Sequence, residues 1–158
     1  MITETRRRIT VKGVKPIGKK QYVRESFYVY GTVSPHSGKG FFLELPNLDT
    51  ECFQIFLDEF KKSHRNGFHL IFLDNASCHF SKSLRVAGNI ALIPIPPYSP
   101  ELNPVERIWE ELKKEIAWEI FENLDLLSQK ISEIVLSWES QMLKNLTLYP
   151  YIKEAFIA

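Results

Sequence analysis

The sequence predicts one α/β domain, built on a mixed β-sheet with helices on both faces. Residues 27–45 show a hairpin pattern, and two later apolar runs, at 68–73 and 90–95, are typical of strands in a parallel sheet. Helical patterns follow the hairpin and each of these two strands, which gives the element order of an α/β fold. In such sheets, reactive groups gather at the carboxyl ends of the parallel strands.

The composition is that of a folded protein with a hydrophobic core. The chain has 158 residues, of which 44% are hydrophobic and 13% aromatic. No apolar run approaches the roughly 20 residues of a membrane helix, and the first residues do not resemble a signal peptide. Cys52 and Cys78 show no CxxC spacing, so neither a zinc site nor a disulfide framework is predicted. We therefore expect a cytoplasmic protein.

The first elements form a hairpin region at residues 6–46. Residues 6–11 and 22–33 are rich in β-branched and aromatic side chains, and residues 40–45 fit the returning strand after a turn at 35–38.

A helix is predicted next, at residues 50–64, with Asp49 or Thr50 as its cap. One apolar stripe at helical spacing is formed by Phe53, Phe56, Leu57 and Phe60.

The second half of the chain predicts two strands and three helical stretches. The nearly continuous apolar run at 68–73 predicts a strand buried on both faces. Residues 81–86 fit a short helix, and the prolines of the strand at 90–95 place its far end at a sheet edge. Longer helices are predicted at 104–120 and 124–144.

Two carboxylates stand where chemistry is expected, although each has an ordinary structural explanation. Asp74 directly follows the strand at 68–73, where an Asp commonly makes a turn or caps the next helix. Glu106 falls in a first helical turn after Asn103 and Pro104, where a glutamate can close a capping box. Together, a carboxylate ending a strand and another opening a helix suit a divalent cation, because Mg²⁺ binds a few carboxylates, waters and substrate phosphate.

Two segments make this interpretation specific. Residues 73–79 (LDNASCH) and 96–109 (PPYSPELNPVERIW) closely resemble the second and third catalytic motifs of mariner-like insertion-sequence transposases of the DDE superfamily. The resemblance implies an RNase H-like, retroviral-integrase-like fold, with cleavage of DNA at transposon ends and transfer of the freed 3′ hydroxyl to a target. It also implies two Mg²⁺ or Mn²⁺ ions in the complete site.

By this resemblance, Asp74 is the second and Glu106 the third catalytic, metal-binding carboxylate. Trp109 faces the same side as Val105 and Leu112 and is predicted to lie in the core. Candidate accessory residues, each of which also fits a purely structural role in its loop or helix start, are Asn75, His79, Tyr98 and Asn103.

The sequence departs from the family pattern in two places. Glu106 follows Asp74 by only 32 positions, which predicts a trimmed helix between them. The family's first aspartate lies on a central strand just before the segment matching residues 6–11, and residues 1–5 contain no aspartate. We therefore expect residues 1–158 to form an N-terminally truncated catalytic domain, with catalytic motifs at 68–109 and C-terminal helices at 104–144. Lacking that aspartate and its strand, it is expected to be inactive alone.

Basic residues are concentrated near the N-terminus. Residues 1–40 contain nine Lys or Arg against two acidic residues, a net charge of +7, whereas residues 101–158 have a net charge of −5. The basic segment fits either a phosphate-binding surface or a solvated hairpin. The residues expected to contact DNA are Arg6, Arg7, Arg8, Lys12, Lys15, Lys19 and Lys20.

Three functions are therefore compared. The first is an incomplete transposase catalytic domain, dimeric when complete and nucleoid-associated in a prokaryote, either a remnant or completed by an upstream reading frame through frameshifting. The second is a non-catalytic fragment that binds DNA or full-length transposase and acts as an inhibitor. The third, an unrelated nucleotide-binding enzyme, is disfavoured because no glycine-rich phosphate loop follows any strand.

Overall fold

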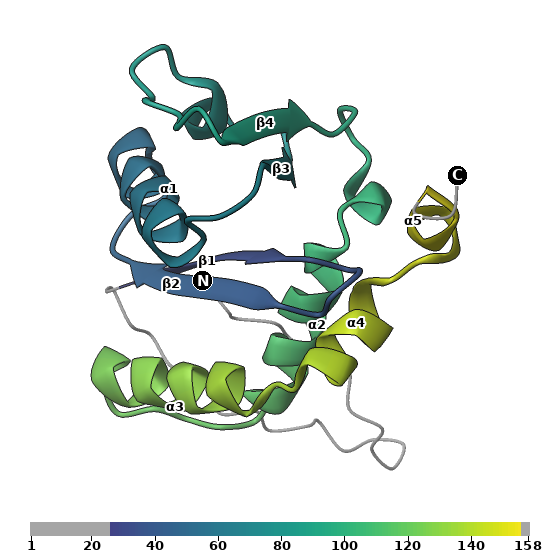
Figure 1. Cartoon of the computed structure of the whole chain (residues 1–158). Helices are drawn as coiled ribbons and strands as arrows, with labels where there is room; N and C mark the ends of the chain where they lie inside the picture. Colours follow the sequence, from purple (N-terminus) through teal and green to yellow (C-terminus); the bar gives the residue numbers. More distant parts are fainter. Residues whose placement is uncertain (1–25, 156–158) are drawn as a thin grey trace.

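The computed structural model describes residues 26–155 of the chain. Figure 1 shows a two-stranded hairpin in the middle of the molecule, with α1 and a second strand pair on one side and α3 on the other. The elements, in chain order, are β1 (Tyr28–Val33), β2 (Gly40–Leu45), α1 (Thr50–Ser63), β3 (His69–Leu73), η1 (Ser77–Phe80), β4 (Ile90–Pro94), η2 (Pro100–Leu102), α2 (Val105–Glu115), α3 (Leu124–Ser137), α4 (Ser140–Thr147) and α5 (Pro150–Ala155).

The hairpin agrees with the prediction within the described residues. Strands β1 and β2 pair antiparallel, with Tyr28 opposite Leu45 and Val33 opposite Gly40. Its turn contains Gly38 at φ +69°, a conformation that favours glycine, and a Cβ there would lie 1.8 Å from the backbone oxygen of Ser140. The expected strand at 6–11 lies outside the described residues.

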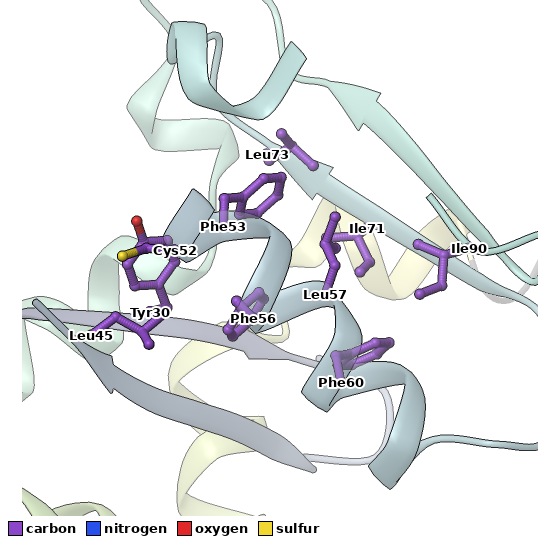
Figure 2. Packing of buried hydrophobic residues seen from close by; sticks show 10 residues of the cluster. All are labelled: Tyr30, Leu45, Cys52, Phe53, Phe56, Leu57, Phe60, Ile71, Leu73 and Ile90. Carbon is purple, nitrogen blue, oxygen red and sulfur yellow. The ribbon is translucent and has the colours of Figure 1, made fainter. Parts of the chain in front are cut away.

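Helix α1 also follows the prediction. Asp49 caps it, accepting a hydrogen bond of 2.8 Å from the backbone N–H of Cys52. The predicted stripe is buried and packs between the hairpin and β3 (Figure 2). We call this the first cluster; its buried members are Tyr30, Leu45, Cys52, Phe53, Phe56, Leu57, Phe60, Ile71, Leu73 and Ile90.

The opposite face of the hairpin covers a second cluster, made by the C-terminal helices. Its buried members are Ile108, Leu112, Ile116, Ile131, Ile134, Trp138 and Leu143. Phe42 of β2 packs against it, with its ring edge-on to Trp109 and Trp138 at centroid distances of 6.1 and 5.6 Å. The Ser128 hydroxyl donates a 2.5 Å hydrogen bond to Glu44 of β2 and so ties α3 to the hairpin. Trp109 therefore has the predicted core position.

Strand β1 and helix α2 approach each other at a glycine. A Cβ on Gly31 would lie 2.6 Å from the ring of Phe42 and 2.6 Å from Cη2 of Trp109, closer than side-chain atoms pack. Only a residue without a side chain fits this contact.

The two strand pairs are separate within residues 26–155. Strands β3 and β4 pair in parallel and form a sheet apart from the hairpin, which agrees with the expectation that the central strand between the two pairs is missing from this part of the chain. The prediction that β3 is buried on both faces is wrong: Ile71 and Leu73 are buried, whereas Phe68, Leu70 and Phe72 are 63%, 55% and 58% exposed. A continuous apolar run shows that both faces suit burial, but burial requires an element to cover each face.

Three helix predictions need correction. The short helix expected at 81–86 is absent, and the only helical turn between β3 and β4 is η1, at Ser77–Phe80. The helix expected at 104–120 ends at Glu115. The helix expected at 124–144 is broken at Trp138, whose backbone is extended and whose indole N–H donates a 3.0 Å hydrogen bond to Glu115 of α2. Among the described helices, none is long and apolar enough to cross a membrane.

Candidate active site

A cleft of about 360 Å³ lies beyond the carboxyl ends of β3 and β4. It contains both predicted catalytic carboxylates and three of the four predicted accessory residues; the fourth, His79, is not part of its lining. The lining residues are Asp74, Asn75, Ile95, Pro96, Pro97, Tyr98, Ser99, Pro100, Asn103 and Glu106.

Asp74 directly follows β3, at the position expected for a reactive group in an α/β sheet. Its Oδ1 accepts a 3.1 Å hydrogen bond from the backbone N–H of Ala76, so the side chain also makes the turn that the structural explanation anticipated. The side chain is nevertheless 66% exposed. Because the turn uses Oδ1, forming it is compatible with binding a metal through the second carboxylate oxygen.

His79 stands behind Asp74. Its Nδ1 lies 3.0 Å from Oδ1 of Asp74, and its ring packs against Phe53 with a centroid distance of 4.4 Å. The side chain is 15% exposed. This arrangement fits a residue that orients the carboxylate and is itself held by the first cluster.

Asn75 joins the two strand ends below the cleft. Its side-chain amide donates a 2.6 Å hydrogen bond to the carbonyl oxygen of Ile95, and the backbone N–H of Ile95 donates to the carbonyl oxygen of Leu73 at 2.9 Å. The proline-rich loop after β4 therefore starts from a point fixed relative to Asp74.

Glu106 enters the cleft from the first turn of α2. The helix begins at Val105, one residue later than the expected start at Pro104, and Pro104 carries no side-chain capping bond. Asn103 still contributes, because its Oδ1 accepts a long hydrogen bond (3.4 Å) from the Val105 N–H and its carbonyl oxygen accepts one from the Glu106 N–H (3.1 Å). Burial, and then the nearby negative charge of Asp74, raise the pKa of the Glu106 carboxyl. The two carboxylates are thus within electrostatic reach of each other.

The donor chemistry of the pair fits a hard divalent cation. Carboxylate oxygens are the ligands that Mg²⁺ prefers, and Mg²⁺ is commonly held by one or two carboxylates with waters and substrate phosphate completing its shell. Within residues 26–155, no three His, Cys, Asp or Glu side chains gather into a metal-binding group. The described part of the cleft therefore brings together two carboxylates that could hold such an ion.

One contact to the proline-rich loop after β4 (residues 95–104) comes from a region that the motifs did not indicate. The Tyr151 hydroxyl donates a 3.1 Å hydrogen bond to the carbonyl oxygen of Leu102, and Arg107 Nε donates to the Tyr149 hydroxyl at 3.3 Å. Burial raises the pKa of Tyr151. Nothing in the local sequence around residues 149–151 signals this contact, because its partners are more than 40 positions away. The basic residues expected to bind DNA, from Arg6 to Lys20, lie outside the described residues.

Comparison with known proteins establishes the family. A family model described as "DDE superfamily endonuclease" matches residues 2–128. The chain belongs to this family. The resemblance that the two motifs carry is confirmed by this match, and DDE superfamily endonucleases generally use divalent metal ions.

Two individual proteins are similar to the chain. An uncharacterized protein of Sinorhizobium fredii (strain NBRC 101917 / NGR234), y4pE/y4sA, is 45% identical over 87 residues, which cover 54% of this chain and 64% of that protein. The structure resembles the Mos1 transposase in its paired-end complex with the left transposon end, with a TM-score of 0.71 and 12% identity over 98% of this chain and 49% of that chain. This likeness shows the RNase H-like fold. The chain spans less than two thirds of either protein.

Proposed function

We propose that this chain is part of a transposase catalytic domain that cleaves phosphodiester bonds at transposon ends and transfers the freed 3′ hydroxyl to target DNA. The observation that supports this most directly is the convergence of Asp74 and Glu106 on one cleft, from two elements, inside the segment that matches the endonuclease family. We assign residues 1–158 to this domain, with a hairpin region at 6–46, catalytic motifs at 68–109 and C-terminal helices at 104–144.

In this proposal, Asp74 and Glu106 hold Mg²⁺ or Mn²⁺, with two ions in the complete site. When bound, such ions supply the charge that activates the attacking oxygen and stabilises the leaving one. The chain's own residues position the ligands: His79 and the Ala76 N–H orient Asp74, and the helical start at Asn103 orients Glu106. The rigid loop between the two strand ends and α2 maintains their spacing.

The test combines metal binding with cleavage. Calorimetry of the full chain should show weak Mn²⁺ binding, detectable only at high concentration, which either Asp74→Asn or Glu106→Gln removes. Tight binding that survives both substitutions would exclude the assignment.

Cleavage of DNA bearing the element's ends should require an upstream segment, fused in frame, that supplies the family's first aspartate. The restored activity should then be lost in Asp74→Ala. Cleavage by the chain alone, abolished by Asp74→Ala, would show that two carboxylates suffice.

One observation also favours a second candidate, a non-catalytic fragment that binds DNA or full-length transposase and inhibits it. Among the described residues, the cleft has two acidic side chains, Asp74 and Glu106, and no group of three metal-binding side chains is present. This candidate predicts that the chain lowers cleavage by full-length transposase in a mixture, and that the Asp74→Asn chain lowers that cleavage to the same extent. The catalytic proposal instead predicts that the fused chain cleaves DNA and that substitution of Asp74 removes this cleavage.

The basic N-terminal segment supplies the proposed DNA contact. If its arginines and lysines meet phosphates, binding is steeply salt-dependent, because each contact releases counterions. Neutralising Arg6, Arg7 and Arg8 should flatten the slope of log affinity against log salt by up to about 0.9 per lost contact. An unchanged slope would show that these arginines do not contact phosphate and that the segment is an ordinary solvated surface. DNA binding would place the protein on the nucleoid of a prokaryote, and paired transposon ends would require a dimer.

A further inference from the structure

Tyr98 is unusual in both its backbone and its exposure. Its φ is +59°, in the left-handed region that non-glycine residues rarely adopt, and its side chain is fully exposed, at 102%. A left-handed conformation is unfavourable for a tyrosine because its Cβ crowds the backbone. The fully exposed ring does not pack against the protein, so within the described residues packing of this side chain does not stabilise the strained backbone.

The loop restrains the backbone at Tyr98. Pro96, Pro97 and Pro100 restrict φ around it, and the Ser99 hydroxyl donates a 3.3 Å hydrogen bond to the carbonyl oxygen of Pro97. The loop starts at Ile95, which two hydrogen bonds fix to the end of β3. A rigid backbone with an aromatic side chain of only two rotatable bonds loses little conformational entropy on binding.

The position of Tyr98 identifies the kind of ligand. It lines the same cleft as Asp74 and Glu106, so a molecule whose phosphate meets those carboxylates through a metal ion passes close to the ring. An uncharged flat ring does not attract phosphate as a lysine or arginine does, whereas every nucleobase presents a face on which an aromatic ring stacks.

We propose that Tyr98 stacks on an unpaired nucleobase next to the phosphate that is cleaved or joined. This rests on the proposed function and adds a substrate-contacting residue to it. Stacking of one base on an aromatic ring contributes about 1–3 kcal/mol, which corresponds to roughly 5- to 150-fold in affinity. The contact would favour DNA ends with an unstacked base over continuous duplex.

Three substitutions separate stacking from other roles of this residue. Tyr98→Phe keeps the ring and removes the hydroxyl, so it should bind like the parent chain. Tyr98→Asn removes the ring but tolerates the left-handed backbone, so it should fold normally and lose the stacking. Tyr98→Trp should bind at least as well as the parent. Equal melting temperatures of the Asn variant and the parent show that the loop is intact.

The experiment is photocrosslinking of the full chain to a DNA hairpin whose unpaired 3′ tail carries 5-iodouracil, with Ca²⁺ in place of Mg²⁺ so that a phosphate can be held at the carboxylates without cleavage. We expect a crosslinked peptide containing Tyr98, its retention in Tyr98→Phe, and at least a fivefold loss of tail-dependent affinity in Tyr98→Asn. A crosslink mapping elsewhere, unchanged affinity in Tyr98→Asn, or no binding of the tailed hairpin would overturn the proposal. Metal binding is measured separately, by calorimetry of the DNA-free chain with Mn²⁺, so a failure of the metal-site assignment appears there and is distinguished from a failure of the stacking proposal.

Discussion

The two carboxylates of the site stand on different halves of the molecule. Asp74 extends from β3, which packs into the first cluster with α1, whereas Glu106 opens α2, whose residues Ile108 and Leu112 belong to the second cluster. The first half is rich in phenylalanine and positions its carboxylate at the end of a strand. The second half is helical and positions its carboxylate in a first turn.

The hairpin connects these halves because its two faces belong to different clusters. Tyr30 and Leu45 face the first cluster, and Phe42 and Val29 face the second. The spacing of the carboxylates therefore depends on both cores, and a two-stranded element transmits any change from one to the other. A site assembled in this way is expected to fail when either half loosens.

The largest expected effect comes from opening a cavity in either half. Leu57→Ala and Ile108→Ala remove side chains that are 2% and 0% exposed, and each should lower the free energy of unfolding by about 2–5 kcal/mol. Leu136→Ala, at an 85% exposed position, is the matched control and should have little effect.

Tryptophan fluorescence tests whether the halves unfold together. All three tryptophans lie in the second half, at Trp109, Trp118 and Trp138. If the hairpin couples the clusters, Leu57→Ala lowers the midpoint of the tryptophan transition and of the circular dichroism transition equally. A tryptophan transition that Leu57→Ala leaves in place would show that the halves unfold independently.

The next effect concerns the orientation of Asp74 alone. His79→Ala removes the group 3.0 Å from its carboxylate and should weaken Mn²⁺ binding about tenfold, the lower end for loss of a partner to a metal ligand. His79→Asn, which can place an N–H near the position of Nδ1, should recover most of the affinity. If both variants bind Mn²⁺ like the parent chain, His79 only fills space against Phe53.

A smaller effect is expected at the far end of the proline-rich loop after β4. Tyr151→Phe removes the hydroxyl that donates to the carbonyl oxygen of Leu102 and should cost about 0.5–1.5 kcal/mol of the local stability of α5. Hydrogen exchange at residues 150–155 should become faster, while the melting temperature of the whole chain changes little. Unchanged exchange would show that α5 is held by its other contacts.

The smallest effect is electrostatic and joins the halves directly. The pKa of the Glu106 carboxyl is raised in the folded state, so folding disfavours its ionised form. The protonated carboxyl therefore contributes to the free energy of unfolding below pH 4.5, its ordinary pKa, and this contribution is lost as the pH rises through the raised pKa of the folded chain. Above that pH, the Glu106→Gln chain should therefore have a slightly larger free energy of unfolding than the parent chain. The gain is small because the side chain remains exposed to water.

Asp74→Asn sharpens this comparison. Since the charge of Asp74 contributes to the raised pKa of Glu106, its removal should lower that pKa, as measured by NMR titration of the Glu106 carboxyl. An unchanged value would mean that burial alone sets the pKa and that the carboxylates are electrostatically separate.

Local patterns predicted most of the elements and half of the residues that line the cleft. The stripe from Phe53 to Phe60 and the cap at Asp49 involve neighbours within a few positions, so the sequence contains the whole cause. The motifs around Asp74 and Glu106 likewise name five residues that the structure brings to one cleft, whose role in catalysis stays a prediction.

What could not be predicted depends on contacts between distant residues. The break at Trp138 is stabilised by a hydrogen bond to Glu115, and helical periodicity in residues 124–144 contains no sign of it. The exposed face of β3 has the same origin, because hydrophobicity does not specify whether a covering element is present. Tyr98 was predicted to shape its loop, but its positive φ and full exposure depend on the path of the loop in the folded chain, which the motif does not specify.

The close approach at Gly31 has a consequence for sequence variation. Strand β1 contacts α2 where this glycine meets Trp109, three positions after Glu106 and therefore on nearly the same side of the helix. Relatives that carry alanine at this position need a smaller side chain at position 42 or 109. Without one, α2 shifts, and the residue matching Glu106 moves away from the residue matching Asp74. Positions 31, 42 and 109 should therefore covary among relatives. A relative with a larger residue at position 31 and no compensating change at 42 or 109 should have its two carboxylates displaced from each other.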